Sequence, residues 1–349
     1  MPQIIGGLPN LPPFRTDLIR RLFKQLVPIA LALALLAYAL KDISFAQIGQ
    51  QFRQARYGWI ALVALLTVLL FLVRGKRWQL PLLALGYAPT VFRTTVATMA
   101  GVIASMIVPG SGELTRCATL QRTDQVPFSQ GVGSVVAERV IDLLMLLLLL
   151  LLTFLLELNR MQTYLAGLSF RWPTTTAWAL GIGTLLVAGA GGWYLFRNET
   201  FREHPIIAKL ANTVKGLWQG FFAIRQVQKL YLFVLLTLLN QALSWLSTYW
   251  LLMALDSTRA LPPTAALTIL AVSSLGGLAV PTQGGIGTYH FFVSRALVLY
   301  GFTPAEGAIV ATFLHAVGFA INLLLSSLSF LLVPFLLTNN RVGSENSAV

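Results

Sequence analysis

The chain has 349 residues, of which 56% are hydrophobic and only 11% are charged, and its mean hydropathy is +0.74. These polar residues are too few to cover the surface of a soluble globule of this size. The composition therefore excludes a soluble protein and indicates an integral membrane protein. The formal net charge of +13 does not indicate nucleic acid, because the basic residues lie mainly in loops and at helix ends, where anionic lipid headgroups are nearer.

Eight stretches of the sequence are rich in apolar residues. Most of them reach the roughly 20 residues that a helix needs to cross the ~30 Å hydrocarbon core of a bilayer. We therefore predict an all-α fold, a polytopic membrane helix bundle of about eight spans. The runs cover residues 26–40, 57–73, 93–108, 131–156, 177–196, 230–255, 264–280 and 307–337.

The first run, 26–40, has a second interpretation. It is short, it follows a basic segment, and Ala37-Tyr38-Ala39 resembles the cleavage site of a secretory signal peptide. A signal peptide normally begins nearer the N-terminus and is not followed at once by further spans. We therefore expect a retained first span.

Two of the runs end at a Val-Pro pair and give way to a short polar stretch that is rich in glycine. These two breaks cover residues 108–116 and 280–290. Within hydrocarbon, irregular backbone is tolerated only where protein or a water-filled cavity surrounds it. Interrupted helices at corresponding places of two halves are typical of a transporter's binding site. We therefore predict a binding site at the two breaks. The segments that follow them can re-enter the bilayer without crossing it.

The spacing of the two breaks predicts an internal repeat. Aligning Pro109 with Pro281 also aligns Trp78 with Trp250. Beyond the breaks, a few extra residues in the second connection bring Arg139 onto His315. We predict a single integral membrane domain, 1–349, that contains two four-helix units, 1–157 and 177–337. A parallel and an inverted arrangement of the units are both open.

Three charged residues lie deep in the predicted span 131–156. At a rise of 1.5 Å per residue, Glu138 is ~10 Å and Asp142 is ~16 Å from its start, where each charge costs a few kcal/mol. Arg139 stands between them, and spacings of three and four place the three on one helix face. We interpret them as substrate-binding or proton-handling residues; the alternative is a structural ion pair between helices.

The first break adds two candidate binding residues, Glu113 and Arg116, which are three positions apart. If a helix starts here, Glu113 can instead be a simple cap at its N-terminus. The second break leads into a predicted helix start whose backbone amides, with an arginine nearby, suit a phosphate. Its candidates are Gly284, Gly285, Gly287, His290 and Arg295. The glycines alone are weak evidence, because turns also use glycine.

Three polar positions in other predicted spans have weaker interpretations. His315 is a candidate binding residue as the counterpart of Arg139, although a histidine inside a membrane is often a hydrogen-bonded structural residue. Asn240 and Gln241 are expected to form hydrogen bonds between helices.

Several kinds of enzyme have no signature in the sequence. No lysine is followed by serine or threonine, and neither His-Glu-x-x-His nor Gly-x-Ser-x-Gly occurs. With three histidines and the single Cys117, a metal centre is not expected. We predict that the protein is not an enzyme and has no catalytic residues, metal or cofactor.

Three motifs together resemble the lysylphosphatidylglycerol synthase transmembrane-region family, which is also described as flippase-like. They are Pro-Gly-Ser-Gly-Glu-Leu-Thr-Arg at 109–116, Glu-Arg-Val-Ile-Asp at 138–142 and Pro-Thr-Gln-Gly-Gly-Ile-Gly at 281–287. The family includes the N-terminal membrane domain of the multiple peptide resistance factor, which moves aminoacylated phosphatidylglycerol between leaflets. The chain departs from it at His315, where many members are expected to have arginine, and around 289–290, where a glutamate often occurs.

The resemblance implies a multi-pass protein of the plasma (cell inner) membrane whose partners are membrane lipids with an anionic phospholipid or lipid-linked headgroup. It implies no nucleic-acid partner, and it leaves open a homo-oligomer or a complex with a lipid-synthesis enzyme. The large soluble domain that transfers lysine in bifunctional members is missing from the sequence, so aminoacyl transfer is not expected.

From the residues and the resemblance together, we predict a flippase-like lipid transporter. A polar cleft between the two units would carry a phospholipid, a glycolipid or a lipid-linked precursor. Arg116, Arg139 and the amides of Gly284 to Gly287 would hold a phosphate, while Glu138 and Asp142 balance charge or relay protons. The alternatives are a non-transporting partner of a lipid-modifying or glycosyl-transferring enzyme, and an ion-coupled carrier of a small hydrophilic solute.

Overall fold

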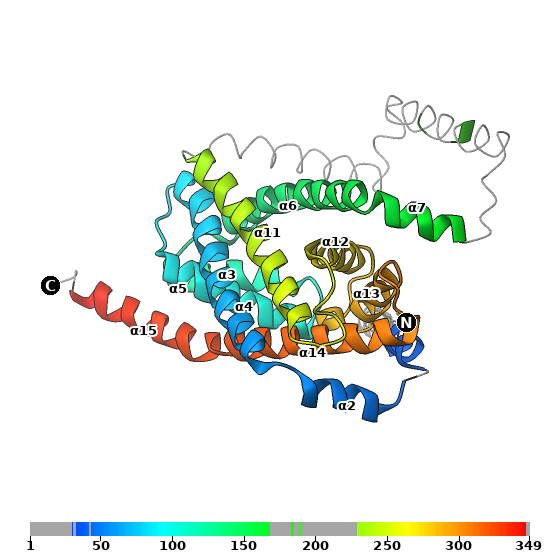
Figure 1. Ribbon diagram of the computed structural model, residues 1–349. Coiled ribbons are helices and arrows are strands. Elements are labelled where there is room, and N and C mark those ends of the chain that lie inside the picture. Colours follow the sequence, from blue (N-terminus) through cyan, green and yellow to red (C-terminus); the bar gives the residue numbers. More distant parts are fainter. Residues whose placement is uncertain are drawn as a thin grey trace, which may run out of the picture.

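The computed structural model describes residues 43–167 and 229–346, together with 33–41 and residues 30, 183, 184 and 189. Within these ranges every regular element is a helix, so the predicted all-α fold is confirmed (Figure 1). Two of the predicted runs lie partly outside the described residues. Of the run 26–40 the structure describes residue 30 and residues 33–40, and of the run 177–196 it describes only residues 183, 184 and 189.

The helices differ in length and fall into long spans and shorter elements. They are α2 (Phe45–Gln54), α3 (Tyr57–Ala84), α4 (Val91–Ile107), α5 (Ser111–Asp124), α6 (Phe128–Leu156), α7 (Leu158–Gly167), α11 (Leu230–Met253), α12 (Pro263–Ala279), the 3₁₀ turn η2 (Gln283–Gly285), α13 (Thr288–Val298), α14 (Pro304–Ser327) and α15 (Ser329–Asn346).

Four segments of the described chain are long and apolar enough to cross a membrane. They are α3, α6, α11 and the stretch Pro304–Leu337, which contains α14 and the start of α15. The predicted runs 93–108 and 264–280 are also helices, α4 and α12, but each has only 17 residues. At 1.5 Å per residue such a helix is ~26 Å long, so it falls short of the ~30 Å core.

Helix α3 is longer than the predicted run 57–73. It continues to Ala84 and carries Arg74 and Arg77 inside the helix rather than in a loop. The sequence between them and Pro81 contains no helix breaker except Gly75, and Pro81 itself stands in the last turn. The apolar run 57–73 therefore marks only the first part of this helix.

Each Val-Pro break joins a short apolar helix to a second helix that packs against it. Helix α4 contacts α5, and α12 contacts α13, so each pair is a helical hairpin. Both first helices end in the same way, with Val108 N–H bonded to Ala104 O and Val280 N–H to Gly276 O at 2.9 Å. The chain then turns through Gly110 and Gly284, whose positive φ values of 75° and 57° favour glycine.

The two long helices α3 and α11 lie side by side and run in opposite directions (Figure 1). At one end of the pair Arg56 N–H donates to Ala254 O at 2.9 Å. In the middle Arg74 contacts Asn240. At the other end the Arg77 guanidinium lies over the ring of Phe233. The start of α3 therefore meets the end of α11.

The remaining contacts link the two hairpins to the long helices that follow them. Helix α6 packs against α5 and α12, while α14 packs against α13 and α4. Each of these long helices therefore contacts both hairpins. Much of α6 exposes leucine side chains outward, as is expected of a helix in contact with lipid.

Candidate functional site

The structure brings the two breaks to one cavity of about 1300 Å³, here called the large cavity. The first break contributes Pro109 and Gly110 to its lining, and the second contributes Pro281 and Gly284. The other walls are formed by α3, α4, α6, α11 and α12. Segments more than 170 positions apart in the sequence thus line a common space.

The most buried part of the site is an ion triad centred on Glu138, whose side chain is 3% exposed. One carboxylate oxygen accepts hydrogen bonds from the Arg77 guanidinium. The other accepts from Arg116 Nη2 at 2.6 Å. The Arg116 guanidinium also lies 4.6 Å from the centroid of the Trp78 ring. Both oxygens of Glu138 are therefore paired, as a buried carboxylate requires.

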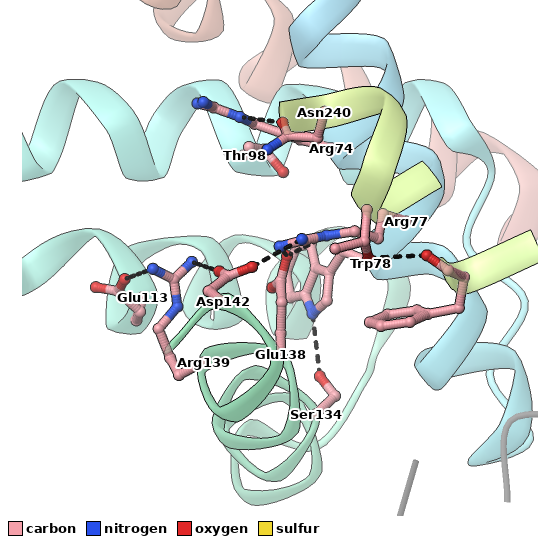
Figure 2. Close-up of polar contacts among 12 residues, drawn as sticks. Arg74, Arg77, Trp78, Thr98, Glu113, Ser134, Glu138, Arg139, Asp142 and Asn240 are labelled. Carbon is pink, nitrogen blue, oxygen red and sulfur yellow. Dashed lines mark hydrogen bonds and ion pairs between the residues drawn. The ribbon is translucent and has the colours of Figure 1, made fainter. Parts of the chain in front are cut away.

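The triad continues outward as a row of alternating charges (Figure 2). Arg77 Nη1 donates to Asp142 at 2.7 Å, and Asp142 contacts Arg139 at 3.3 Å. Arg139 also lies 3.7 Å from Glu113, and its side chain is 52% exposed. The network of Arg116, Glu138, Arg77, Asp142, Arg139 and Glu113 is called the charge cluster below. It runs from a buried interior to a half-exposed end.

The charge cluster is balanced, because its three arginines face three carboxylates. Arg74 adds a fourth arginine to the wall of the large cavity. Its Nε donates to the neutral Asn240 Oδ1 at 3.1 Å. Among the described residues it has no carboxylate within ion-pair distance. The large cavity therefore carries a net positive charge, which suits an anionic ligand.

The wall beyond the charge cluster is apolar. Helix α6 continues from Asp142 into a run of leucines, and α4 and α12 supply further apolar side chains. They include Leu143, Leu144, Leu146, Leu149, Val102, Met106 and Leu278. One cavity thus combines a charged end with a hydrophobic wall, which is the arrangement that an amphipathic molecule needs.

Of the predicted site residues, five of the six charged ones and two of the three glycines of the second break line the large cavity, whereas Gly287 does not. The residues that line it are Glu113, Arg116, Glu138, Arg139, Asp142, Gly284 and Gly285.

The two histidines support the second break and are not among the described residues that line the cavity. His315 Nε2 lies 2.9 Å from Gly284 O. His290 Nδ1 accepts from Gly287 N–H at 3.3 Å. The centroids of the two rings are 4.8 Å apart, and each ring is hydrogen-bonded to the backbone of the second break. Their hydrogen bonds fit the structural interpretation of an intramembrane histidine.

Arg295 lies in the last turn of α13 and does not line the large cavity. Its Nη2 donates to Tyr38 Oη at 3.0 Å. The structure therefore places it with the N-terminal segment and away from the charge cluster.

Sequence reasoning did not identify Arg74 and Arg77 as site residues, because both follow the end of the apolar run 57–73. The available signal was their spacing of three on an uninterrupted helix, the same pattern that identified Arg139 and Asp142. Asn240 was expected to bond between helices, and its contact with Arg74 confirms this. In the described part of the chain no group of three or more histidine, cysteine or acidic residues could hold a metal ion.

Comparison with known protein families gives a match over residues 25–326 to the family described as "Lysylphosphatidylglycerol synthase TM region". No curated protein and no solved structure matches the chain. The matched residues include both hairpins, the charge cluster and the long helices around them. Because the match covers most of the chain, this integral membrane protein belongs to the lysylphosphatidylglycerol synthase TM region family.

Proposed function

We propose that the protein moves a polar-headed lipid, a phospholipid, glycolipid or lipid-linked precursor, between the leaflets of the plasma membrane through the large cavity. The observation that carries the proposal is the amphipathic lining of this cavity. The half-exposed end of the charge cluster offers Arg139 to a headgroup phosphate. The leucines of α6 next to it offer a path for an acyl chain. The protein acts here as a transporter and not as an enzyme.

The size of the large cavity supports a lipid over a small solute. Its volume of about 1300 Å³ exceeds the ~300–1,000 Å³ that is typical of pockets for small ligands. An apolar wall favours binding only of a ligand that has apolar surface to bury. A small hydrophilic solute has little such surface, so the wall would add little to its binding free energy. A lipid fills both parts of the cavity at once.

We also infer that the two units form an inverted repeat. The same close approach occurs where each hairpin meets the following helix. A Cβ on Gly131 of α6 would lie 3.3 Å from Cys117 of α5, and one on Gly307 of α14 would lie 2.7 Å from Ser294 O of α13. The antiparallel course of α3 and α11 supports the inverted over the parallel arrangement. Rocking of such units around a fixed site gives alternating access.

Reconstitution into lipid vesicles tests the proposal. Vesicles would contain phosphatidylglycerol with a headgroup fluorophore, and a membrane-impermeant quencher would report the share of lipid in the outer leaflet. We expect the protein to expose inner-leaflet lipid to the quencher, while protein-free vesicles keep it protected. Lipid that co-purifies with the protein but is never translocated would instead support the non-transporting partner of a lipid-modifying enzyme.

A further inference from the structure

Arg74 lies between the large cavity and a second, smaller space of about 210 Å³, here called the small chamber. Arg74 is a lining residue of both the large cavity and the small chamber. The small chamber is bordered by α3, α11, α12, α13 and α14, so it belongs mainly to the second unit. Besides Arg74, its polar lining residues are Thr67, Ser244, Ser247, Thr248, Ser273, Tyr289 and Asn322.

Arg74 differs from the three arginines of the charge cluster in its partners. Each of those is paired with at least one carboxylate, whereas the described hydrogen bond of Arg74 goes from Nε to the neutral Asn240. Its two terminal nitrogens have no protein partner in the ranges that the structure describes. Figure 2 draws Arg74 and Asn240 as a pair apart from the ion row. Arg74 can therefore offer paired N–H donors to an incoming anion.

Four hydroxyls of the small chamber, those of Thr67, Ser244, Thr248 and Ser273, donate to backbone carbonyls of their own helices. Thr67 Oγ1 donates to Val63 O at 2.8 Å, and Thr248 Oγ1 donates to Ser244 O at 3.0 Å. Each of these four hydroxyls donates its proton within its own helix, so its oxygen lone pairs can accept hydrogen bonds from a group in the chamber. Such a lining suits a group that donates hydrogen bonds, such as the hydroxyls of a glycerol or sugar, or an ammonium.

The volumes limit what each space can hold. About 210 Å³ lies below the ~300–1,000 Å³ of typical ligand pockets, so the small chamber has room for a headgroup but not for acyl chains. The large cavity, with its apolar wall, has room for both. A lipid whose phosphate contacts Arg74 can therefore extend its headgroup into the chamber while its chains stay on the other side.

We propose that Arg74 is the binding residue for the phosphate of the transported lipid, and that the small chamber receives the hydroxyl or amine groups of its headgroup. This assignment rests on the proposed function for the lipid nature of the ligand. Arg74 lies on α3 and is common to the linings of both spaces. The phosphate then contacts Arg74 while the headgroup lies in the small chamber and the acyl chains lie in the large cavity.

Binding to the full-length protein in neutral detergent tests this assignment, with isothermal titration calorimetry as the readout. The probes are short-chain phosphatidylglycerol, diacylglycerol with the same chains, and inorganic phosphate. We expect Arg74→Gln to weaken phosphatidylglycerol binding by about tenfold or more, because a charge-assisted hydrogen-bond pair is lost. Arg74→Lys should fall in between, since lysine keeps the charge but not the planar fork.

Lys76→Gln is the matched control. Lys76 stands two residues further along α3, also bonds a neutral amide, Gln79 Oε1 at 2.8 Å, and lines neither space. We expect the Lys76→Gln variant to bind phosphatidylglycerol as tightly as the wild type does. The chamber is tested with Thr248→Val, which should weaken phosphatidylglycerol a few-fold but leave phosphatidylmethanol, whose headgroup has no donor, unchanged. Elution volume and melting temperature would show that each variant is folded.

The outcomes separate this inference from the proposed function. If Arg74→Gln binds and translocates lipid like Lys76→Gln, the assignment of Arg74 is overturned and the transport proposal stands. If binding depends on Arg74 but the wild type moves no lipid in vesicles, the site stands and transport falls. If inorganic phosphate binds as tightly as phosphatidylglycerol, the site serves free phosphate, and the lipid assignment is overturned.

Discussion

At the scale of single residues, neighbouring charges of the cluster have different tasks. Glu138 is buried and fully paired, while Arg139, next to it in the chain, faces the large cavity and is half exposed. The sequence placed both on one polar helix face and left open whether they form a structural ion pair or a binding site. Their burial favours the structural role for Glu138 and the binding role for Arg139.

We expect Glu138→Gln to destabilise the protein. The substitution leaves Arg77 and Arg116 buried without their shared carboxylate, and breaking a buried ion pair by removing one partner costs about 3–5 kcal/mol. Thermal unfolding in detergent should show a much lower melting temperature. Glu113→Gln is the control, because Glu113 is partly exposed and its contact with Arg139 is 3.7 Å long. Equal melting temperatures for the two variants would contradict the structural role of Glu138.

We expect Arg139→Ala to leave the protein folded but to slow lipid translocation in vesicles by at least about tenfold, the loss expected for a charge-assisted contact. Arg77 still neutralises Asp142 in this variant, so no carboxylate is left buried and unpaired. Arg259→Ala is the matched control: its side chain is 51% exposed and it also pairs with an aspartate three positions away, but outside the large cavity. Unchanged translocation by Arg139→Ala would remove Arg139 from the site.

At the scale of the elements, the hairpins depend on close contacts that only glycine permits. A Cβ on Gly307 would lie 2.7 Å from the backbone oxygen of Ser294, which cannot move without shifting α13. We expect Gly307→Ala to destabilise the protein by about 1–3 kcal/mol through overpacking. In the same helix Gly318 has open space around its Cβ position, so Gly318→Ala should be neutral or stabilising by up to ~1 kcal/mol. Melting temperatures that fall equally would contradict the predicted difference.

The elements that could be predicted from the sequence are those with a local signal. The apolar runs located α4, α6, α11 and α12 to within a few residues, and the Val-Pro pairs located both breaks. The end of α3 was missed because its apolar run stops at residue 73, whereas the helix continues to Ala84. Arg77 is kept in the helix by its contacts with Glu138 and Asp142, which are more than 60 positions away. The spacing of Arg74 and Arg77 was a local signal that they share a helix face, but it does not indicate which distant residues they contact.

At the scale of the whole molecule, the site arises because segments of both units meet. The sequence predicted that the two breaks form one site, but it did not indicate that α3 of the first unit would supply Arg74 and Arg77 to it. It also left parallel and inverted arrangements open. That choice depends on the relative direction of α3 and α11, which is a tertiary property and leaves no trace in hydropathy. The contacts at the ends of this helix pair make the direction testable.

We expect the double variant Arg56→Cys, Ala254→Cys to form a disulfide under mild oxidation. The backbone hydrogen bond of 2.9 Å between these residues holds them at the end where α3 begins and α11 finishes. The native Cys117 is buried and would be replaced by serine in all variants. A shift in gel mobility after cleavage between the units, reversed by reductant, measures the cross-link.

The control pairs Arg56→Cys with Lys229→Cys, at the opposite end of α11. Helix α11 has 24 residues, so its ends are ~36 Å apart, far beyond the ~7 Å that a disulfide tolerates between Cα atoms. An antiparallel pair therefore cross-links only at Ala254, and a parallel pair only at Lys229. A cross-link at Lys229 would contradict the inverted arrangement. A cross-link at Ala254 alone supports it.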